Sequence, residues 1–175
     1  PYWTNGAFAG MPAYQISAMY LAHKLENVQK LFSRLLPHPV RYIFICFLGF
    51  YFLLQVLKLD PWLSVAGALA FGLSSWFFIF IDTGHNSKIA AISYMAPVLA
   101  GIIILYRGKI LAGLALTSLF LSMEIFCNHP QITYYLGFII LFYILSELFN
   151  ALPRKNADPS VAGKENKLPD FIKRS

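Results

Sequence analysis

Residues 89–106 read IAAISYMAPVLAGIIILY, a run that contains no charged side chain. A helix needs about 20 consecutive apolar residues to cross the hydrocarbon core of a bilayer. Within hydrocarbon, only helices and closed barrels satisfy their own backbone hydrogen bonds, and a run without polar alternation favours the helix. The stretch therefore predicts a membrane-spanning helix, which Pro97 is expected to kink.

Four further apolar runs flank this stretch. They carry at most one charged residue each, Glu124 near the end of one run and Glu147 near the end of another. We therefore expect an all-α fold, a polytopic transmembrane helical bundle, over residues 42–150. The predicted spans cover residues 42–57, 62–81, 89–106, 110–127 and 132–149.

The composition excludes a soluble globular domain. Hydrophobic residues make up 58% of the chain and charged residues 13%, whereas soluble domains hold roughly 45–50% and about 25%. The net charge of +6 comes from basic residues at the ends of the apolar runs and in the tail, so it indicates a membrane partner and no nucleic acid. Cys46 and Cys127 lie inside apolar runs and are expected to be small buried hydrophobes.

The two ends of the chain are more polar than its centre. Residues 1–41 are expected to form the rear of an outer, periplasmic loop, in which residues 13–36 form an interfacial amphipathic helix. Residues 151–175 contain prolines and several basic residues and are expected to be a polar cytoplasmic tail or linker. Because the chain starts at Pro1 without an initiator Met, we expect an excerpt of a longer protein.

Basic residues also predict which side of the membrane each connector faces. Lys58 follows the first span, Arg107 and Lys109 follow the third, and the tail after the fifth is basic. The opposite connectors, 82–88 and 128–131, contain only one Lys or Arg between them. Since cytoplasmic loops carry the excess of Lys and Arg, these two connectors are expected on the outer side.

The two outer connectors carry the candidate chemistry. The first reads DTGHNSK over 82–88 and the second reads NHPQ over 128–131. A carboxylate beside an imidazole can act as a base, bind a metal or organise a phosphate site, and a lysine can meet a phosphate. The candidate catalytic residues are Asp82, His85 and Glu124, and the candidate substrate-binding residues are Asn86, Lys88, Asn128, His129 and Gln131.

Structural alternatives exist for several of these residues. Asp82, Asn86 and Ser87 are of types that favour helix N-caps, so they could instead cap a helix that starts near Ile89. Glu124 could extend its carboxylate to the membrane interface. The chain lacks a phosphate-binding Gly-rich loop with a lysine, a zinc-type cluster of Cys and His, and a nucleophile elbow, so a soluble nucleotide-dependent reaction is not expected.

Three motifs carry a resemblance to a known family. They are WTNGAFAGMPAYQ over 3–15, DTGHNSK over 82–88 and NHPQITYY over 128–135. In this order they resemble segments of the YfhO family of bacterial membrane proteins, in the form found in Bacteroidetes. The resemblance extends to about residue 150.

The YfhO family looks like the GT-C superfamily of polytopic glycosyltransferases. The resemblance implies transfer of a sugar from a polyprenyl-phosphate donor to a glycopolymer or lipid acceptor outside the bacterial cytoplasmic membrane. It implies an acidic catalytic residue upstream of Pro1, and it places Asp82 and His85 in the second outer loop, where such enzymes often hold acidic or metal-linked groups. The cofactor stays unknown, and stabilisation of the leaving group by a cation or divalent metal would be the main catalytic effect.

The alternative is a non-catalytic membrane protein, either a transporter of a polar or lipid-linked solute or an assembly scaffold. A transporter is expected to hold ionisable residues near the middle of its spans. Glu124 and Glu147 lie near span ends, which favours chemistry at the outer face. We expect the excerpt alone to be inactive.

Overall fold

The computed structural model describes residues 3–4, 10–12, 34 and 36–152. Nearly all of the predicted interfacial helix and of the predicted tail lies outside these residues. Within them, a two-residue strand β1 (Trp3–Thr4) pairs antiparallel with β2 (Met11–Pro12). The remaining regular structure is helical, which agrees with the expected all-α class.

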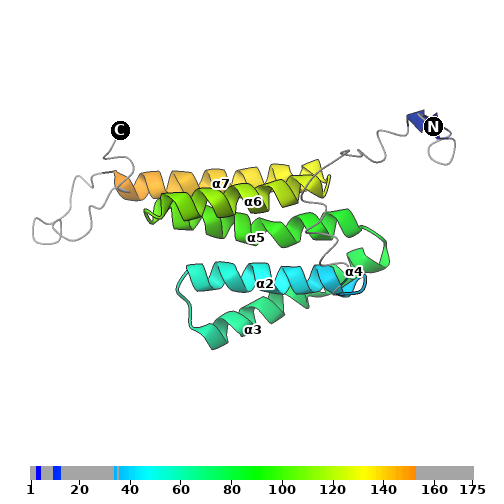
Figure 1. The fold of residues 1–175 in the computed structure, drawn as a ribbon, viewed down its shortest axis with the longest axis horizontal. Helices are drawn as coiled ribbons and strands as arrows, with labels where there is room; N and C mark the ends of the chain where they lie inside the picture. The colour runs from blue at the N-terminus through cyan, green and yellow to red at the C-terminus, as the bar shows by residue number, and fades with distance from the viewer. Residues whose placement is uncertain (1–2, 5–9, 13–33, 35, 153–175) are drawn as a thin grey trace, which may run out of the picture.

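Six helices follow in chain order (Figure 1). They are α2 (Val40–Val56), α3 (Pro61–Gly72), α4 (Ser75–Asp82), α5 (Asn86–Tyr106), α6 (Ile110–Phe126) and α7 (Pro130–Ala151).

Three helical stretches of the described part are long and apolar enough to cross a membrane. They are Pro61–Asp82, which comprises α3 and α4, Asn86–Tyr106 and Pro130–Ala151. Helices α2 and α6 are also apolar but have 17 residues each, which is the lower limit for a transmembrane helix. Length and composition therefore support a membrane protein.

The second predicted span, 62–81, is divided into two helices. Helix α3 ends at Gly72, and Ser74 has an extended backbone, with φ −62° and ψ 143°, before α4 begins. Gly72 packs so tightly that a Cβ there would lie 2.3 Å from the ring of Phe47. Ser74 is the N-cap residue of α4, although its side chain makes no capping hydrogen bond.

Helix α5 is the centre of the bundle. It packs most extensively against α6 and α2, which lie on opposite sides of it in Figure 1. Ala91, Val98 and Ala100 of α5 are fully buried. Small residues allow α5 and α6 to approach each other closely. At Gly101, an added Cβ would lie only 2.6 Å from Thr117 Oγ1.

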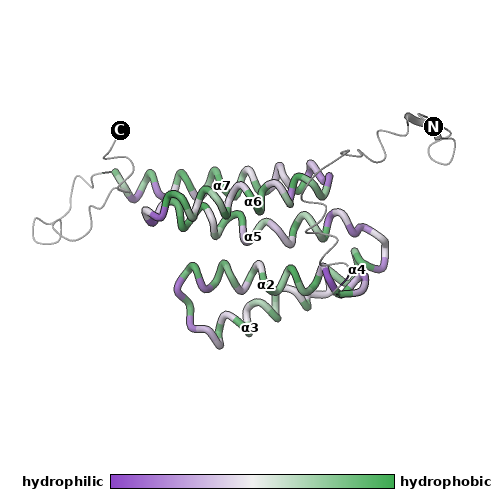
Figure 2. The backbone as a smooth tube through the Cα atoms, in the orientation of Figure 1, coloured by the Kyte–Doolittle hydropathy of each residue, from purple (hydrophilic) through white to green (hydrophobic). Residues whose placement is uncertain are grey.

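The outer helices expose large apolar side chains. In α7, Ile132 and Leu136 are buried, whereas Phe142 and Phe149 are 66% and 70% exposed. Figure 2 shows hydrophobic residues along the helix bodies and most hydrophilic residues near the helix ends. An exposed apolar surface of this extent is typical of a protein that faces lipid or other protein segments.

The helix directions place the connectors at two ends of the bundle (Figure 1). The α4–α5 and α6–α7 connectors lie at one end, together with the start of α2. The α2–α3 and α5–α6 connectors lie at the other end. We call the first end the polar-site end, because it holds the residues of both candidate motifs.

Candidate functional site

The α4–α5 connector is a tight turn. The Thr83 hydroxyl donates back to the Ile79 carbonyl at 3.0 Å, and Gly84 takes a positive φ of +79°, a conformation that glycine adopts without strain. His85 is the N-cap residue of α5, although its side chain makes no capping hydrogen bond. Helix α5 therefore begins at Asn86.

The capping alternative for the first motif is wrong. Asn86 and Ser87 lie within the first turn of α5, and Asp82 is the last residue of α4, so none of them occupies the N-cap position. The side chains of Asp82 and His85 are exposed. These polar groups are thus not needed to start the helix.

Lys88 lies against aromatic rings of α4. Its Nζ is 4.1 Å from the ring centroid of Phe80 and 5.5 Å from that of Trp76. The imidazole of His85 also contacts Phe80, with 5.6 Å between the ring centroids. Cation–π attraction thus holds the ammonium at the polar-site end, where an anionic ligand would compete with the rings for it.

The α6–α7 connector reverses the chain within a few residues. Asn128 has a left-handed backbone, with φ +53°, which asparagine tolerates better than most residues and which ends α6. Pro130 is the first residue of α7, a position where its missing N–H costs nothing. His129 lies between these two residues in the chain, at the tip of the connector.

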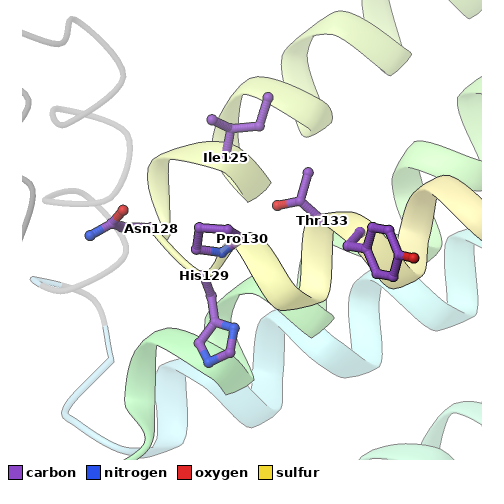
Figure 3. Close-up of a pocket in the computed structure, with 6 residues that line it drawn as sticks. Ile125, Asn128, His129, Pro130 and Thr133 are labelled. Atoms are coloured by element: carbon purple, nitrogen blue, oxygen red, sulfur yellow. The ribbon is translucent and has the colours of Figure 1, made fainter. Parts of the chain in front are cut away.

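A pocket of about 350 Å³ opens at this connector (Figure 3). The imidazole of His129 and the amide of Asn128 extend in different directions from the loop in Figure 3. The sequence analysis assigned His129 and Asn128 to the site. It did not assign the four other residues that line the pocket, although all of them lie within about one helical turn of the connector. The residues that line the pocket are Ile125, Asn128, His129, Pro130, Thr133 and Tyr134.

The two connectors interact electrostatically through His129. Burial lowers the pKa of His129 below its ordinary value, and the nearby groups Lys88 and His85 lower it further. Among the described residues, the buried His129 Nδ1 and Asn86 Oδ1 have no hydrogen-bond partner. An imidazole, an ammonium and two polar atoms without hydrogen-bond partners thus gather at one end of the bundle, and of these the Lys88 ammonium is the group suited to an anion.

Glu124 lies behind the pocket, in the interior. Its side chain is fully buried, so the alternative that it extends to the interface is wrong. The Thr133 hydroxyl lies 3.0 Å from Oε1 and 3.1 Å from Oε2 and can donate its proton to only one of them at a time. Thr133 therefore connects the buried carboxyl with the lining of the pocket.

Asp82 and Gln131 are not part of the pocket lining. Asp82 is exposed at the end of α4, and the Gln131 amide donates to the Tyr135 hydroxyl at 2.8 Å on the surface of α7. Within the part of the chain that the structure describes, no group of three or more His, Cys, Asp or Glu side chains could hold a metal ion.

The site is defined by its own chemistry: the imidazole of His129 lines a pocket at the end of an apolar bundle, and Lys88 and His85 act on this imidazole electrostatically. No family model, curated protein or solved structure matches this chain. A functional assignment depends on this chemistry and on the motifs in residues 82–88 and 128–135.

Proposed function

We propose that this chain is the membrane-embedded part of a GT-C-like glycosyltransferase that transfers a sugar from a polyprenyl-phosphate donor to an extracytoplasmic glycopolymer or lipid. One observation carries the proposal: Lys88 and His85 of one connector act electrostatically on His129 of the other, at one end of an apolar bundle. A donor anchored in lipid holds its phosphate at headgroup depth, where the ends of spanning helices emerge.

The membrane arrangement follows from the same reasoning. Helices α2, α5, α6 and α7 and the broken pair α3–α4 would cross the cytoplasmic membrane of a bacterium. The polar-site end would face outward, because the connectors at the opposite end carry Lys58, Arg107 and Lys109. The 17-residue helices α2 and α6 would require local thinning of the bilayer or flanking residues that reach the interface.

Five residues of the two connectors have roles in the proposed transfer. The acceptor hydroxyl attacks the anomeric carbon, the bond from this carbon to the phosphate oxygen breaks, and the polyprenyl phosphate leaves with an added negative charge. Lys88 would stabilise that charge, the N–H of neutral His129 would donate a hydrogen bond to it, and Asn86 and Asn128 would orient the donor. Asp82, exposed beside His85, would accept the proton of the hydroxyl.

The proposal is tested with variants of the full-length protein in its native membrane. His129→Ala and His85→Ala should abolish most sugar transfer to the surface acceptor while membrane abundance stays normal. Lys109→Ala, a basic residue at the opposite end of the bundle, is the matched control and should retain activity. Normal transfer by both histidine variants would contradict the proposal and favour an assembly scaffold.

The transport alternative is favoured by one observation, the full burial of Glu124 inside α6. Intramembrane carboxyl groups commonly mark solute or proton pathways. A Glu124→Gln variant separates the two functions. Lost solute uptake with unchanged sugar transfer would support transport, whereas unchanged uptake would exclude this role for Glu124.

A further inference from the structure

A second cavity lies on the flank of the bundle, below the polar-site end. It is a groove of about 290 Å³ with α5 as its floor and α2 and α6 as its walls. Leu48 comes from α2, Tyr94 and Pro97 from α5, and Leu119 and Met123 from α6. Except for the Tyr94 hydroxyl, every side chain named here is apolar.

The groove lies beside the close contact between α2 and α5 and opens to the outside of the bundle. Gly49 approaches α5 so closely that a Cβ there would lie 2.8 Å from the Ser93 carbonyl oxygen and 2.9 Å from the Pro97 ring. Gly49 and Pro97 both line the groove. The rims of the groove are formed by Leu48 and Leu119, whose side chains are 49% and 44% exposed. The groove is therefore open on the outer surface of the helix bundle.

A cation lies on the same helix face, toward the polar-site end. Arg41 is one helical turn before Ile45, a residue of the groove wall, and the spacing 41, 45, 48, 52 places all four on one face of α2. The Arg41 guanidinium donates to the Tyr42 hydroxyl at 2.9 Å and lies 4.8 Å from the centre of that ring. Because tyrosine is neutral, these contacts leave the positive charge available to an anion.

Tyr94 of α5 also lines the groove, and its side chain is buried. The groove lining therefore begins at Ile45, one helical turn from the Arg41 cation, and continues to Pro97 near the middle of α5. This arrangement matches a molecule with an anionic head and a hydrocarbon chain.

We propose that the groove binds one acyl chain of an anionic membrane phospholipid, whose phosphate contacts Arg41. Shape and charge both support this occupant, since the lining is apolar and Arg41, one helical turn beyond Ile45 on the same face of α2, is cationic. The proposal requires the helices to lie in a bilayer but does not require sugar transfer. The test of lipid binding is therefore independent of the roles proposed for the residues of the connectors.

The test measures lipids that remain bound to the purified full chain. The protein is equilibrated with equal amounts of phosphatidylglycerol and phosphatidylcholine of identical chains, and retained lipid is counted by native mass spectrometry. We expect one phosphatidylglycerol to be retained in preference to phosphatidylcholine. Arg41→Gln should reduce the phosphatidylglycerol affinity about fivefold, the effect expected for one cation near an anionic headgroup.

A second variant tests the groove itself. Leu119→Trp places a large side chain at the rim and should reduce retention of both lipids. The controls are Lys109→Gln, a basic residue at the opposite end, and Leu114→Trp, an exposed position on the same helix outside the groove lining. Both controls should leave the retained lipid unchanged. If Leu119→Trp prevents folding, Leu48→Trp fills the groove from the other wall.

Two results would overturn the proposal. The first is equal retention of the two lipids by the unchanged protein. The second is unchanged retention in both Arg41→Gln and the groove-filling variant. A cysteine at Leu48 that cross-links two copies of the chain in the membrane would likewise show that protein, and not lipid, covers the groove.

Discussion

The hydroxyl of Thr133 lies 3.0 Å from Oε1 of Glu124 and joins the first turn of α7 to the last turn of α6. The two residues are brought together by the tight α6–α7 connector, which carries Asn128 and His129. The contact positions a residue of the pocket lining against a buried carboxyl. It therefore links the stability of the helix pair to the geometry of the candidate site.

The first prediction concerns this contact. Thr133→Val removes the donor and leaves the carboxyl of Glu124 unsatisfied, which should destabilise the protein by about 1–3 kcal/mol. Thr133→Ser keeps the hydroxyl and should destabilise the protein less than Thr133→Val does. The double variant Glu124→Met with Thr133→Val removes both partners and should recover most of the loss. Thermal unfolding in one detergent measures all three, and additive losses in the double variant would contradict the contact.

The second prediction concerns the titration of His129. Because burial and the neighbouring Lys88 lower the pKa of His129, the folded protein binds this proton less readily than the unfolded chain does. The stability associated with neutral His129 is thus present above the unfolded pKa of about 6.5 and is lost as the pH falls toward the lower folded pKa. Melting temperatures measured between pH 7.5 and 5 should fall, and the fall should be smaller in His129→Gln.

Lys88 provides an independent check of the same site. Since Lys88 lowers the pKa of His129, Lys88→Gln should raise it. Magnetic resonance of labelled histidine side chains measures the shift, with Lys109→Gln as the control. An unchanged titration of His129 in Lys88→Gln would show that the two connectors do not approach each other.

The third prediction concerns the contact between Lys88 and Phe80. Their 4.1 Å separation implies a cation–π attraction of about 0.5–1 kcal/mol. A double-mutant cycle with Lys88→Met and Phe80→Leu should give a coupling energy of this size. A value near zero would mean that the ammonium lies elsewhere.

The fourth prediction concerns close helix packing. Gly49→Ala places a Cβ 2.8 Å from the Ser93 carbonyl oxygen, so α2 and α5 must move apart, at a cost of about 1–3 kcal/mol. Gly137→Ala is the matched control, because a Cβ there meets nothing within 4 Å. It should be neutral or slightly stabilising, since alanine favours the helix. Equal melting temperatures of the two variants would contradict the packing of α2 on α5.

The helical class was predictable from the sequence, whereas several boundaries were not. The apolar run 89–106 identifies α5, yet this helix starts three residues earlier because the polar residues Asn86–Lys88 form its first turn. The close packing of Gly72, where α3 ends, is against Phe47, which comes from another helix. Patterns along one segment carry no information about such a contact.

The candidate site was predictable only in part. The two polar motifs indicated where chemistry could lie, and Lys88 and His85 of the first motif act electrostatically on His129 of the second. The burial of Glu124 was not predictable, because it depends on how the connector folds and on the hydroxyl that Thr133 supplies. Gln131 shares the motif with His129 but lies on the exposed surface of α7. Membership in a motif thus does not decide where a side chain lies.

The central claim is that both polar connectors emerge on the outer side of one membrane. Single cysteines replace Ser87 and Gln131, which are exposed in the two connectors, and Lys109, which is exposed at the opposite end. The native thiols of Cys46 and Cys127 are buried and should not react. A membrane-impermeant maleimide should label positions 87 and 131 in intact cells and position 109 only after permeabilisation. Labelling of 87 and 131 from opposite sides would contradict the account.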